Sequence, residues 1–221
     1  MTALCQPPSL RRPVVSLRPP ASPEPERPRS ALRVGLLGGS FNPAHDGHLH
    51  VSLEALKRLR LDQVWWLVSP QNPLKAARGM APLAERLAGA QAVVRHPRLK
   101  VMALETRLGT RYTADTLARL TAWPGYRFVW LMGADNLAQL PRWWRWHGIL
   151  AGCPVAVFDR HPYSHAALAG PVARAFACDR LAEDRADALP THPPPAWVFV
   201  RIRPHPASAT AIRAERWAAA G

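Results

Sequence analysis

The chain has 221 residues, of which 48% are hydrophobic, and this suffices for one domain with a sizeable core but not for two full domains. No uninterrupted apolar stretch approaches the ~18 residues of a transmembrane helix, and the three cysteines show no C-x-x-C spacing, so we expect a cytoplasmic protein with free thiols and no membrane partner. The net charge of +14 would suit a nucleic-acid-binding protein, but the basic residues are mostly scattered arginines, so we predict no nucleic-acid partner.

Residues 1–30 hold eight of the 24 prolines and show no apolar periodicity. Such a segment cannot bury enough apolar surface to offset the entropy that ordering costs. We therefore predict a disordered Pro/Arg-rich extension over 1–30 and one folded domain over 31–221. A docking arm for a partner remains the alternative for the extension.

An apolar strand, a glycine-rich turn and a helix open the folded part. The apolar run 34–37 ends at the turn 38–40, where the backbone can approach a ligand closely. After the turn at 42–43, leucines recur at helical spacing, so a helix begins near Gly47 or His48. Its free amide groups and its positive dipole end favour phosphate oxygens.

The rest of the chain alternates between short apolar runs and helical segments. Further strands are predicted at 64–68, 99–104, 128–132, 155–158 and 197–200, and further helices at 82–94, 113–120 and from about 208. This alternation predicts an α/β fold, a single Rossmann-like, doubly wound parallel sheet with helices on both faces. Only 160–196 departs from it, and there we expect broken helix and loop.

Polar residues follow several predicted strands, where ligands of such sheets bind. The proline-containing loop 69–75 leaves the second strand, and the segment 133–136 leaves the fourth. Thr113 is the predicted cap of its helix, with Asp115 in the first turn.

His45 and His48 lie three residues apart beside the first predicted helix start. Imidazole N–H groups there can donate to phosphate oxygens while charge builds up during a transfer. An isolated pair at this spacing would more often hold zinc or lie incidentally on the surface; only the preceding strand and glycine turn reverse that preference. The phosphate loop of P-loop kinases and the dinucleotide motif of typical dehydrogenases are absent.

Two segments resemble the paired signatures of the nucleotidyltransferase superfamily. GGSFNPAHDGH at 38–48 is similar to G-G-[ST]-F-[DN]-P-x-H-x-G-H, and SATAIR at 208–213 is similar to [ST]-[SA]-T-x-[IL]-R. Within the superfamily, the chain resembles the bacterial nicotinate-nucleotide adenylyltransferases. The segments that carry this closer likeness are 69–75, 112–117, 133–136 and 141–143.

The resemblance implies adenylyl transfer from ATP to nicotinate mononucleotide, which gives deamido-NAD and pyrophosphate in NAD biosynthesis. The mononucleotide phosphate would attack the α-phosphorus of ATP directly, with Mg²⁺ screening the phosphates, so the protein would align the substrates and stabilise charge. ATP and nicotinate mononucleotide would be its partners, and a homo-oligomer is left open.

The resemblance also implies a role for each matching residue. The residues implied to be catalytic are His45, His48 and Arg213. Those implied to bind ATP are Gly38, Gly39, Ser40, Phe41, Gly133, Asp135, Ser208 and Thr210. Those implied to bind the mononucleotide are Asn42, Lys75, Thr113 and Trp143. No protein ligand to a metal is expected.

Several of these residues also have a plainer interpretation. Ser208 and Thr210 are suited to capping a helix, Arg213 to a solvated surface, and Asp135 to capping the helix after Gly133. Trp144 and Trp146 are predicted to be packing residues.

A pantetheine-phosphate adenylyltransferase or a cytidylyltransferase would share both signatures. The segment 112–117 and Trp143 argue against these alternatives.

Overall fold

The structure is a computed structural model, which describes residues 31–70 and 79–218. The segment 1–30, whose disorder stays a prediction, and Lys75 lie outside the described residues.

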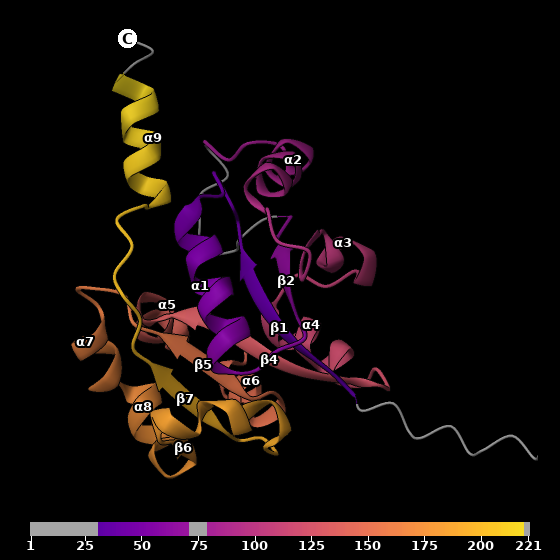
Figure 1. Cartoon of the computed structure of the whole chain (residues 1–221), viewed down its shortest axis with the longest axis vertical. Helices are drawn as coiled ribbons and strands as arrows, with labels where there is room; N and C mark the ends of the chain where they lie inside the picture. The colour runs from indigo at the N-terminus through magenta and orange to yellow at the C-terminus, as the bar shows by residue number, and fades with distance from the viewer. Residues whose placement is uncertain (1–30, 71–78, 219–221) are drawn as a thin grey trace, which may run out of the picture.

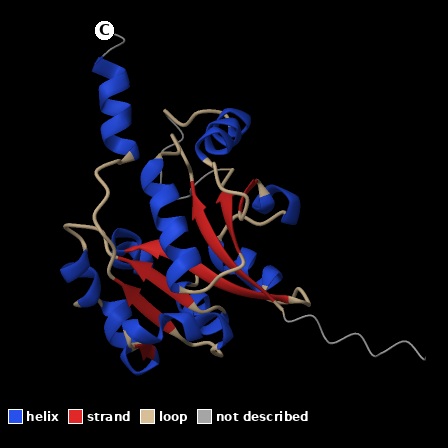
Figure 2. Ribbon diagram, in the orientation of Figure 1, coloured by secondary structure: helices blue, strands red, loops and turns tan. Residues whose placement is uncertain are grey.

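A single sheet of parallel strands organises this part of the chain (Figures 1 and 2). The strands are β1 (Leu32–Gly39), β2 (Gln63–Val68), β3 (Leu99–Met102), β4 (Tyr126–Gly133), β5 (Val155–Phe158), β6 (Arg180–Leu181) and β7 (Trp197–Val200). Their order is β3-β2-β1-β4-β5-β7-β6, and every neighbouring pair is parallel. The chain proceeds outward from β1 to β3, then returns to add β4 on the other side of β1. A crevice is expected where the order reverses, between the carboxyl ends of β1 and β4.

Helices cover both faces of the sheet, so the predicted doubly wound α/β fold is confirmed. The helices are α1 (Asp46–Arg58), α2 (Leu83–Val93), α3 (Leu104–Leu108), α4 (Thr113–Leu120), α5 (Ala134–Gln139), α6 (Trp146–Gly152), α7 (Ser164–Leu168), α8 (Pro171–Ala175) and α9 (Ala209–Ala218), with 3-10 turns η1 (Leu140–Arg142), η2 (Ala177–Asp179) and η3 (Glu183–Thr191). One buried cluster lies between the sheet and α1, α2 and η3. A second lies between the sheet and α3 to α8.

The strands are nearly all apolar because both faces are buried. Trp65 belongs to the cluster under α3 and α4, whereas Trp66 belongs to the cluster under α1. Alternate residues of one strand therefore serve the two cores.

Two local predictions need correction, and one short strand was missed. The strand predicted at 99–104 ends at Met102, because Leu104 already begins α3 with its side chain buried. Tyr112, in extended conformation, is the N-cap of α4, so Thr113 is its first helical residue and not its cap. Strand β6 was not predicted, because two residues carry no periodicity. The broken helix expected over 160–196 is present as α7, α8 and the turns η2 and η3.

The last helix, α9, stands beyond the carboxyl edge of the sheet, above α1 in Figure 1. The Arg213 Nη1 atom donates to the Asn42 carbonyl oxygen at 2.6 Å, which ties α9 to the loop after β1.

Candidate functional site

A cleft of about 1040 Å³ opens at the carboxyl ends of the strands. It is bounded by the loops after β1, β4 and β5 and by the first turns of α1, α4 and α9. The predicted site residues within the described chain all line it: Gly38, Gly39, Ser40, Phe41, Asn42, His45, His48, Thr113, Gly133, Asp135, Trp143, Ser208, Thr210 and Arg213. Lys75 lies outside the described residues, so its predicted role is untested.

Two cleft glycines are required by side chains that press against them. A Cβ atom on Gly38 would lie 2.2 Å from the Trp130 ring, which packs under the end of β1. A Cβ atom on Gly133 would lie 2.4 Å from the Asp135 Oδ1 atom. A side chain at position 38 would therefore meet the Trp130 ring, whereas one at position 133 would require the Asp135 carboxylate to shift.

Phe41 fixes the loop after β1. Its φ of 46° is in the left-handed region that non-glycine residues rarely adopt. Its ring is 2% exposed, stacks on Trp66 at 5.0 Å and lies 4.8 Å from the His48 ring. Burial of this ring offsets the cost of the backbone conformation.

The two signature histidines cap the start of α1 with their own rings. The Gly47 N–H donates to His45 Nδ1 at 3.1 Å, and the His45 N–H donates to His48 Nδ1 at 3.2 Å. A ring nitrogen that accepts an amide hydrogen carries none itself, so each ring hydrogen is assigned to Nε2. The ring centroids lie 3.9 Å apart, so two Nε2–H donors are presented close together.

Burial lowers the pKa of His45 to about 4, with Arg160 and His205 adding to the effect through their charges. His45 is therefore a neutral donor at neutral pH. A neutral imidazole can donate a hydrogen bond to a phosphate oxygen while it keeps its proton.

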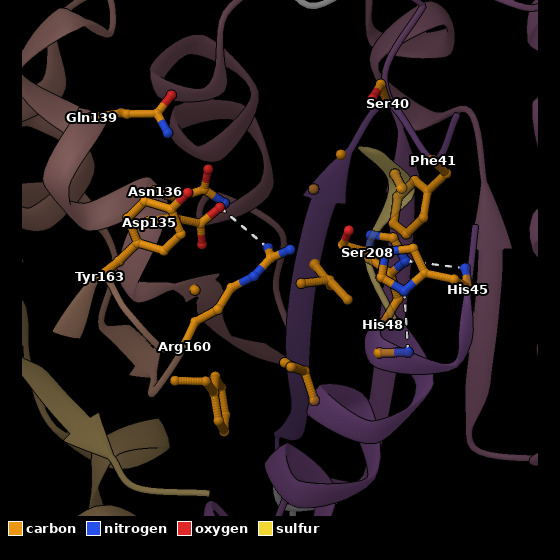
Figure 3. Close-up of a pocket in the computed structure, with 18 of the residues that line it drawn as sticks. Ser40, Phe41, His45, His48, Asp135, Asn136, Gln139, Arg160, Tyr163 and Ser208 are labelled. Atoms are coloured by element: carbon orange, nitrogen blue, oxygen red, sulfur yellow. Dashed lines mark hydrogen bonds and ion pairs between the residues drawn. The ribbon is translucent and has the colours of Figure 1, made fainter. Parts of the chain in front are cut away.

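The opposite wall of the cleft carries Asp135, Asn136, Gln139, Arg160 and Tyr163 (Figure 3). The Arg160 Nη1 atom donates to Asp135 Oδ2 at 3.2 Å. The other oxygen, Oδ1, is buried without a hydrogen-bond partner in the described structure. Arg160 was not predicted. It follows the carboxyl end of β5, so the rule that ligands bind at strand ends was the signal that could have identified it.

Ser208 and Arg213 combine plain and functional features. The Ala211 N–H donates to Ser208 Oγ at 3.1 Å, so Ser208 caps α9 while it lines the cleft on the side of His45 and His48 (Figure 3). The Arg213 Nη2 atom donates to Thr210 Oγ1 at 3.3 Å. With its bond to Asn42, this makes Arg213 a bridge and not a free surface side chain.

The Asn42 side chain is engaged within the protein. Its Nδ2 donates to the Gly79 carbonyl oxygen at 2.9 Å, and its Oδ1 accepts from the Ala81 N–H at 3.3 Å. The predicted contact of this side chain with the mononucleotide would require these bonds to exchange.

The start of α4 and the tryptophans after α5 form the remaining end of the cleft. Trp143 is half-buried, packs against the core and lines the cleft. Trp144 is 57% exposed and lines the cleft 5.6 Å from the Tyr112 ring, so its prediction as a packing residue is wrong. Trp146 packs against the core as predicted.

Glu105 of α3 is a cleft residue that the sequence analysis missed. It is 6% exposed, and burial raises its pKa to about 7. Its folded and unfolded states therefore differ in charge between the ordinary value of 4.5 and about 7. Over this range stability is lost as pH rises, because the unfolded chain releases the proton first.

His45 has the opposite effect. Its folded pKa of about 4 is below the ordinary 6.5. Its contribution to the free energy of unfolding is therefore fully present above pH 6.5 and is lost as pH falls toward 4, because the unfolded chain binds the proton first. Between pH 4.5 and 6.5 the two slopes oppose each other, and each amounts to at most about 1.4 kcal/mol per pH unit.

When one of these two groups is removed by mutation, the free energy of unfolding should change with pH as the other group alone dictates. In Glu105→Gln, the free energy of unfolding should rise by about 2 kcal/mol from pH 4.5 to 6.5. In His45→Asn, which keeps a capping acceptor for Gly47, it should fall by a similar amount. Urea unfolding at three pH values in this range measures both, and slopes of the same sign in the two variants would contradict the assignment.

The described residues hold no group of three or more His, Cys, Asp or Glu side chains that could bind a metal ion. Among the described helices, none has the length and apolar character needed to cross a membrane.

Comparisons with known proteins agree with one another. The family model described as cytidylyltransferase-like matches residues 36–215. A probable nicotinate-nucleotide adenylyltransferase of Cereibacter sphaeroides is 57% identical over 187 residues, which cover 83% of this chain and 98% of the relative. The protein of the same name from Parvibaculum lavamentivorans is 54% identical over 82% of this chain and 91% of its own length.

Among solved structures, the Plasmodium falciparum nicotinic acid mononucleotide adenylyltransferase complexed with NaAD superposes with a TM-score of 0.60. The match covers 83% of each chain at 14% identity. At this identity the likeness establishes the fold alone.

Proposed function

The chain belongs to the cytidylyltransferase-like family and, within it, to the nicotinate-nucleotide adenylyltransferases, and on this premise we propose a role for each part of the cleft. The enzyme transfers the adenylyl group of ATP to nicotinate mononucleotide, which yields deamido-NAD and pyrophosphate for NAD biosynthesis.

One observation carries the proposed roles: residues of both signatures, 38–48 and 208–213, line the same cleft beside the switch point of the sheet. Two helix starts, those of α1 and α9, border this cleft. Each supplies amide donors and a positive dipole end, which favour a polyanion.

The triphosphate of ATP would lie along the wall formed by the loop after β1 and the start of α9. His45 and His48 would donate from Nε2 to oxygens of the reacting phosphates, where negative charge grows during transfer. Ser208, Thr210 and Arg213 would hold the β- and γ-phosphates. Because the mononucleotide phosphate is itself the nucleophile, the residues need only align the two phosphates and stabilise charge.

The nucleotide end of ATP would contact the opposite wall. Gly133 lets the Asp135 carboxylate fold back beside it, and Oδ1 is left without a partner in the described structure. An acceptor of this kind suits a hydroxyl or amino group of the nucleotide. A small rearrangement would be needed, because the atom is buried.

Mg²⁺ would enter with ATP and not as a resident ion. Mg²⁺ is commonly held by substrate phosphates and one or two carboxylates. When bound, it would screen the charge between the two approaching phosphates.

Nicotinate mononucleotide would occupy the end formed by Thr113, Trp143 and Trp144. Trp143 is fixed against the core and offers its free face to a flat pyridine ring. The amides of the first turn of α4 are suited to the nicotinate carboxylate. We place this reaction in the cytoplasm, in keeping with the free thiols of Cys153 and Cys178.

Pyrophosphate release tests the choice of acceptor. The purified enzyme is given Mg²⁺ and ATP with nicotinate mononucleotide, nicotinamide mononucleotide or phosphopantetheine in separate reactions. Fastest release is expected with nicotinate mononucleotide. Faster release with phosphopantetheine would instead favour the pantetheine-phosphate adenylyltransferase alternative.

A further inference from the structure

Arg86 is a buried cation that forms no ion pair with a carboxylate of the described residues. It lies in α2, behind the cleft wall, and is 3% exposed. Within the described residues its guanidinium group makes four hydrogen bonds, all to backbone carbonyl oxygens: Nε to Ala81 at 2.8 Å, Nη1 to Ser40 and to Ser69 at 2.7 Å each, and Nη2 to Pro70 at 2.8 Å. Burying a charge is costly unless its hydrogen bonds are satisfied, and here this is achieved only by gathering three separate backbone segments.

These segments belong to the connections after β1 and β2. Ser40 is in the phosphate-side loop after β1, whereas Ser69 and Pro70 begin the loop after β2. The Ser69 N–H also donates to the Gly39 carbonyl oxygen at 2.9 Å. Arg86 therefore fixes the first residues after β1 relative to the first residues after β2.

The bond to Ser40 also sets the direction of the next amide. The Ser40–Phe41 peptide is trans, so its N–H points opposite to its C=O. Because Arg86 holds the carbonyl, the Phe41 N–H is turned away from Arg86. This N–H makes no hydrogen bond within the described residues, and Phe41 lines the cleft.

Arg213 holds the same loop two peptides further on, through its bond to the Asn42 carbonyl. Two guanidinium groups thus hold the loop after β1, one at Ser40 and one at Asn42, and Phe41 between these two residues has a positive φ. This conformation is costly for a non-glycine residue and persists only where surrounding contacts enforce it.

We propose that Arg86 is a positioning residue for the transfer, which holds the Phe41 N–H toward a phosphate oxygen of ATP and couples the loop after β1 to the loop after β2. This inference rests on the proposed function of the cleft. In this arrangement the Phe41 N–H donates to the phosphate, and the Arg86 side chain orients that N–H without touching the substrate.

Arg86→Lys is the sharpest test, because it keeps the charge and removes the planar fork. A lysine has three donors on one nitrogen and cannot reach four carbonyl oxygens on three segments. Arg95→Lys is the matched control, since Arg95 is exposed and lies outside the cleft lining. For each protein, kcat, both KM values, the melting temperature and the calorimetric Kd of inorganic pyrophosphate are measured.

We expect Arg86→Lys to lower kcat about five- to tenfold and to raise the Kd of pyrophosphate by a similar factor, at temperatures where the variant is fully folded. Arg95→Lys should match the wild type. Wild-type kcat and pyrophosphate affinity in a folded but less stable Arg86→Lys would overturn the proposal and make Arg86 a purely structural residue.

A second measurement does not depend on the variant folding. In the wild-type enzyme, the Phe41 amide proton resonance should move downfield when pyrophosphate is added, and an unchanged resonance would overturn the proposal. Pyrophosphate binding also separates the two hypotheses: if nicotinate mononucleotide proved not to be the acceptor, the affinity of Arg86→Lys for pyrophosphate would still decide the role of Arg86.

Discussion

His48→Ala is expected to lower kcat about a hundredfold or more, with a melting temperature only a few degrees below that of the wild type. The activity loss follows from removing the Nε2–H group that we propose to donate to a phosphate whose charge grows in the transition state, and such donors are worth about 10²- to 10³-fold. The stability loss is that of one capping acceptor, the His48 Nδ1 atom that receives the His45 N–H. A lost cap costs about 1 kcal/mol, which shifts the melting temperature of a chain of this size by roughly 2–4 °C.

His96→Ala supplies a matched control. The His96 Nδ1 atom also accepts a backbone amide hydrogen, from Arg98 at 3.2 Å, but His96 precedes β3 at the opposite edge of the sheet and does not line the cleft. It should lose similar stability and no activity. His48→Gln should recover part of kcat, because a Gln amide can also donate.

Loss of a bound metal would favour the alternative that the two histidines bind zinc. If His48→Ala loses a stoichiometric zinc ion while its turnover follows the zinc content, His45 and His48 are metal ligands. An unchanged kcat would remove His48 from the chemistry altogether.

The position of the cleft could be predicted from the sequence because the strand, the turn and the helix start that form it depend on residues close together in the chain. An apolar run predicts a strand when both of its faces are buried, and a glycine turn followed by a helical repeat predicts a helix start with free amides. Residues such as Ser40 and His48 could thus be assigned to one edge of a sheet before any coordinates. The tight contact between Gly38 and the Trp130 ring could not be predicted, because Trp130 lies on a strand far along the chain.

Arg86 shows why the remainder escaped prediction. In the helical segment 82–94 a lone arginine has the pattern of a solvated face, and its burial depends on loops that begin at Ser40 and Ser69. Trp144 escaped for the converse reason. Tryptophan is highly buried on average, but here only Trp143, which directly follows η1, packs against the core, whereas Trp144 lines the cleft with an exposed ring.

Trp143→Ala is expected to raise KM for nicotinate mononucleotide about thirtyfold while KM for ATP stays near that of the wild type. Stacking on a pyridine ring is worth about 0.5–1.5 kcal/mol beyond the burial of area, and the covered ring face adds a similar amount at about 25 cal/mol per Å². A total of about 2 kcal/mol corresponds to this factor. In the proposed arrangement the triphosphate is held on the other wall by the start of α9 and the loop after β1, so its binding should not change.

Two other tryptophans separate stacking from general loss of packing. Trp123 is also half-buried against the same core cluster, near Tyr126 at the amino edge of β4, and lies outside the cleft lining. Trp123→Ala should lower the melting temperature about as much as Trp143→Ala without changing either KM. Trp144→Ala should raise KM for the mononucleotide only a few-fold, because its exposed ring is not held against the core.

The same kinetics with nicotinamide mononucleotide show whether Trp143 also contributes to the choice of acid over amide. Stacking is indifferent to the charge of the ring substituent, whereas the amides at the start of α4 favour a carboxylate over a neutral carboxamide. Trp143→Ala should therefore raise KM for both mononucleotides by a similar factor and preserve the ratio of the two KM values. Equal impairment toward ATP and the mononucleotide would mean instead that Trp143 is a core residue, and that the nicotinate ring binds elsewhere in the cleft.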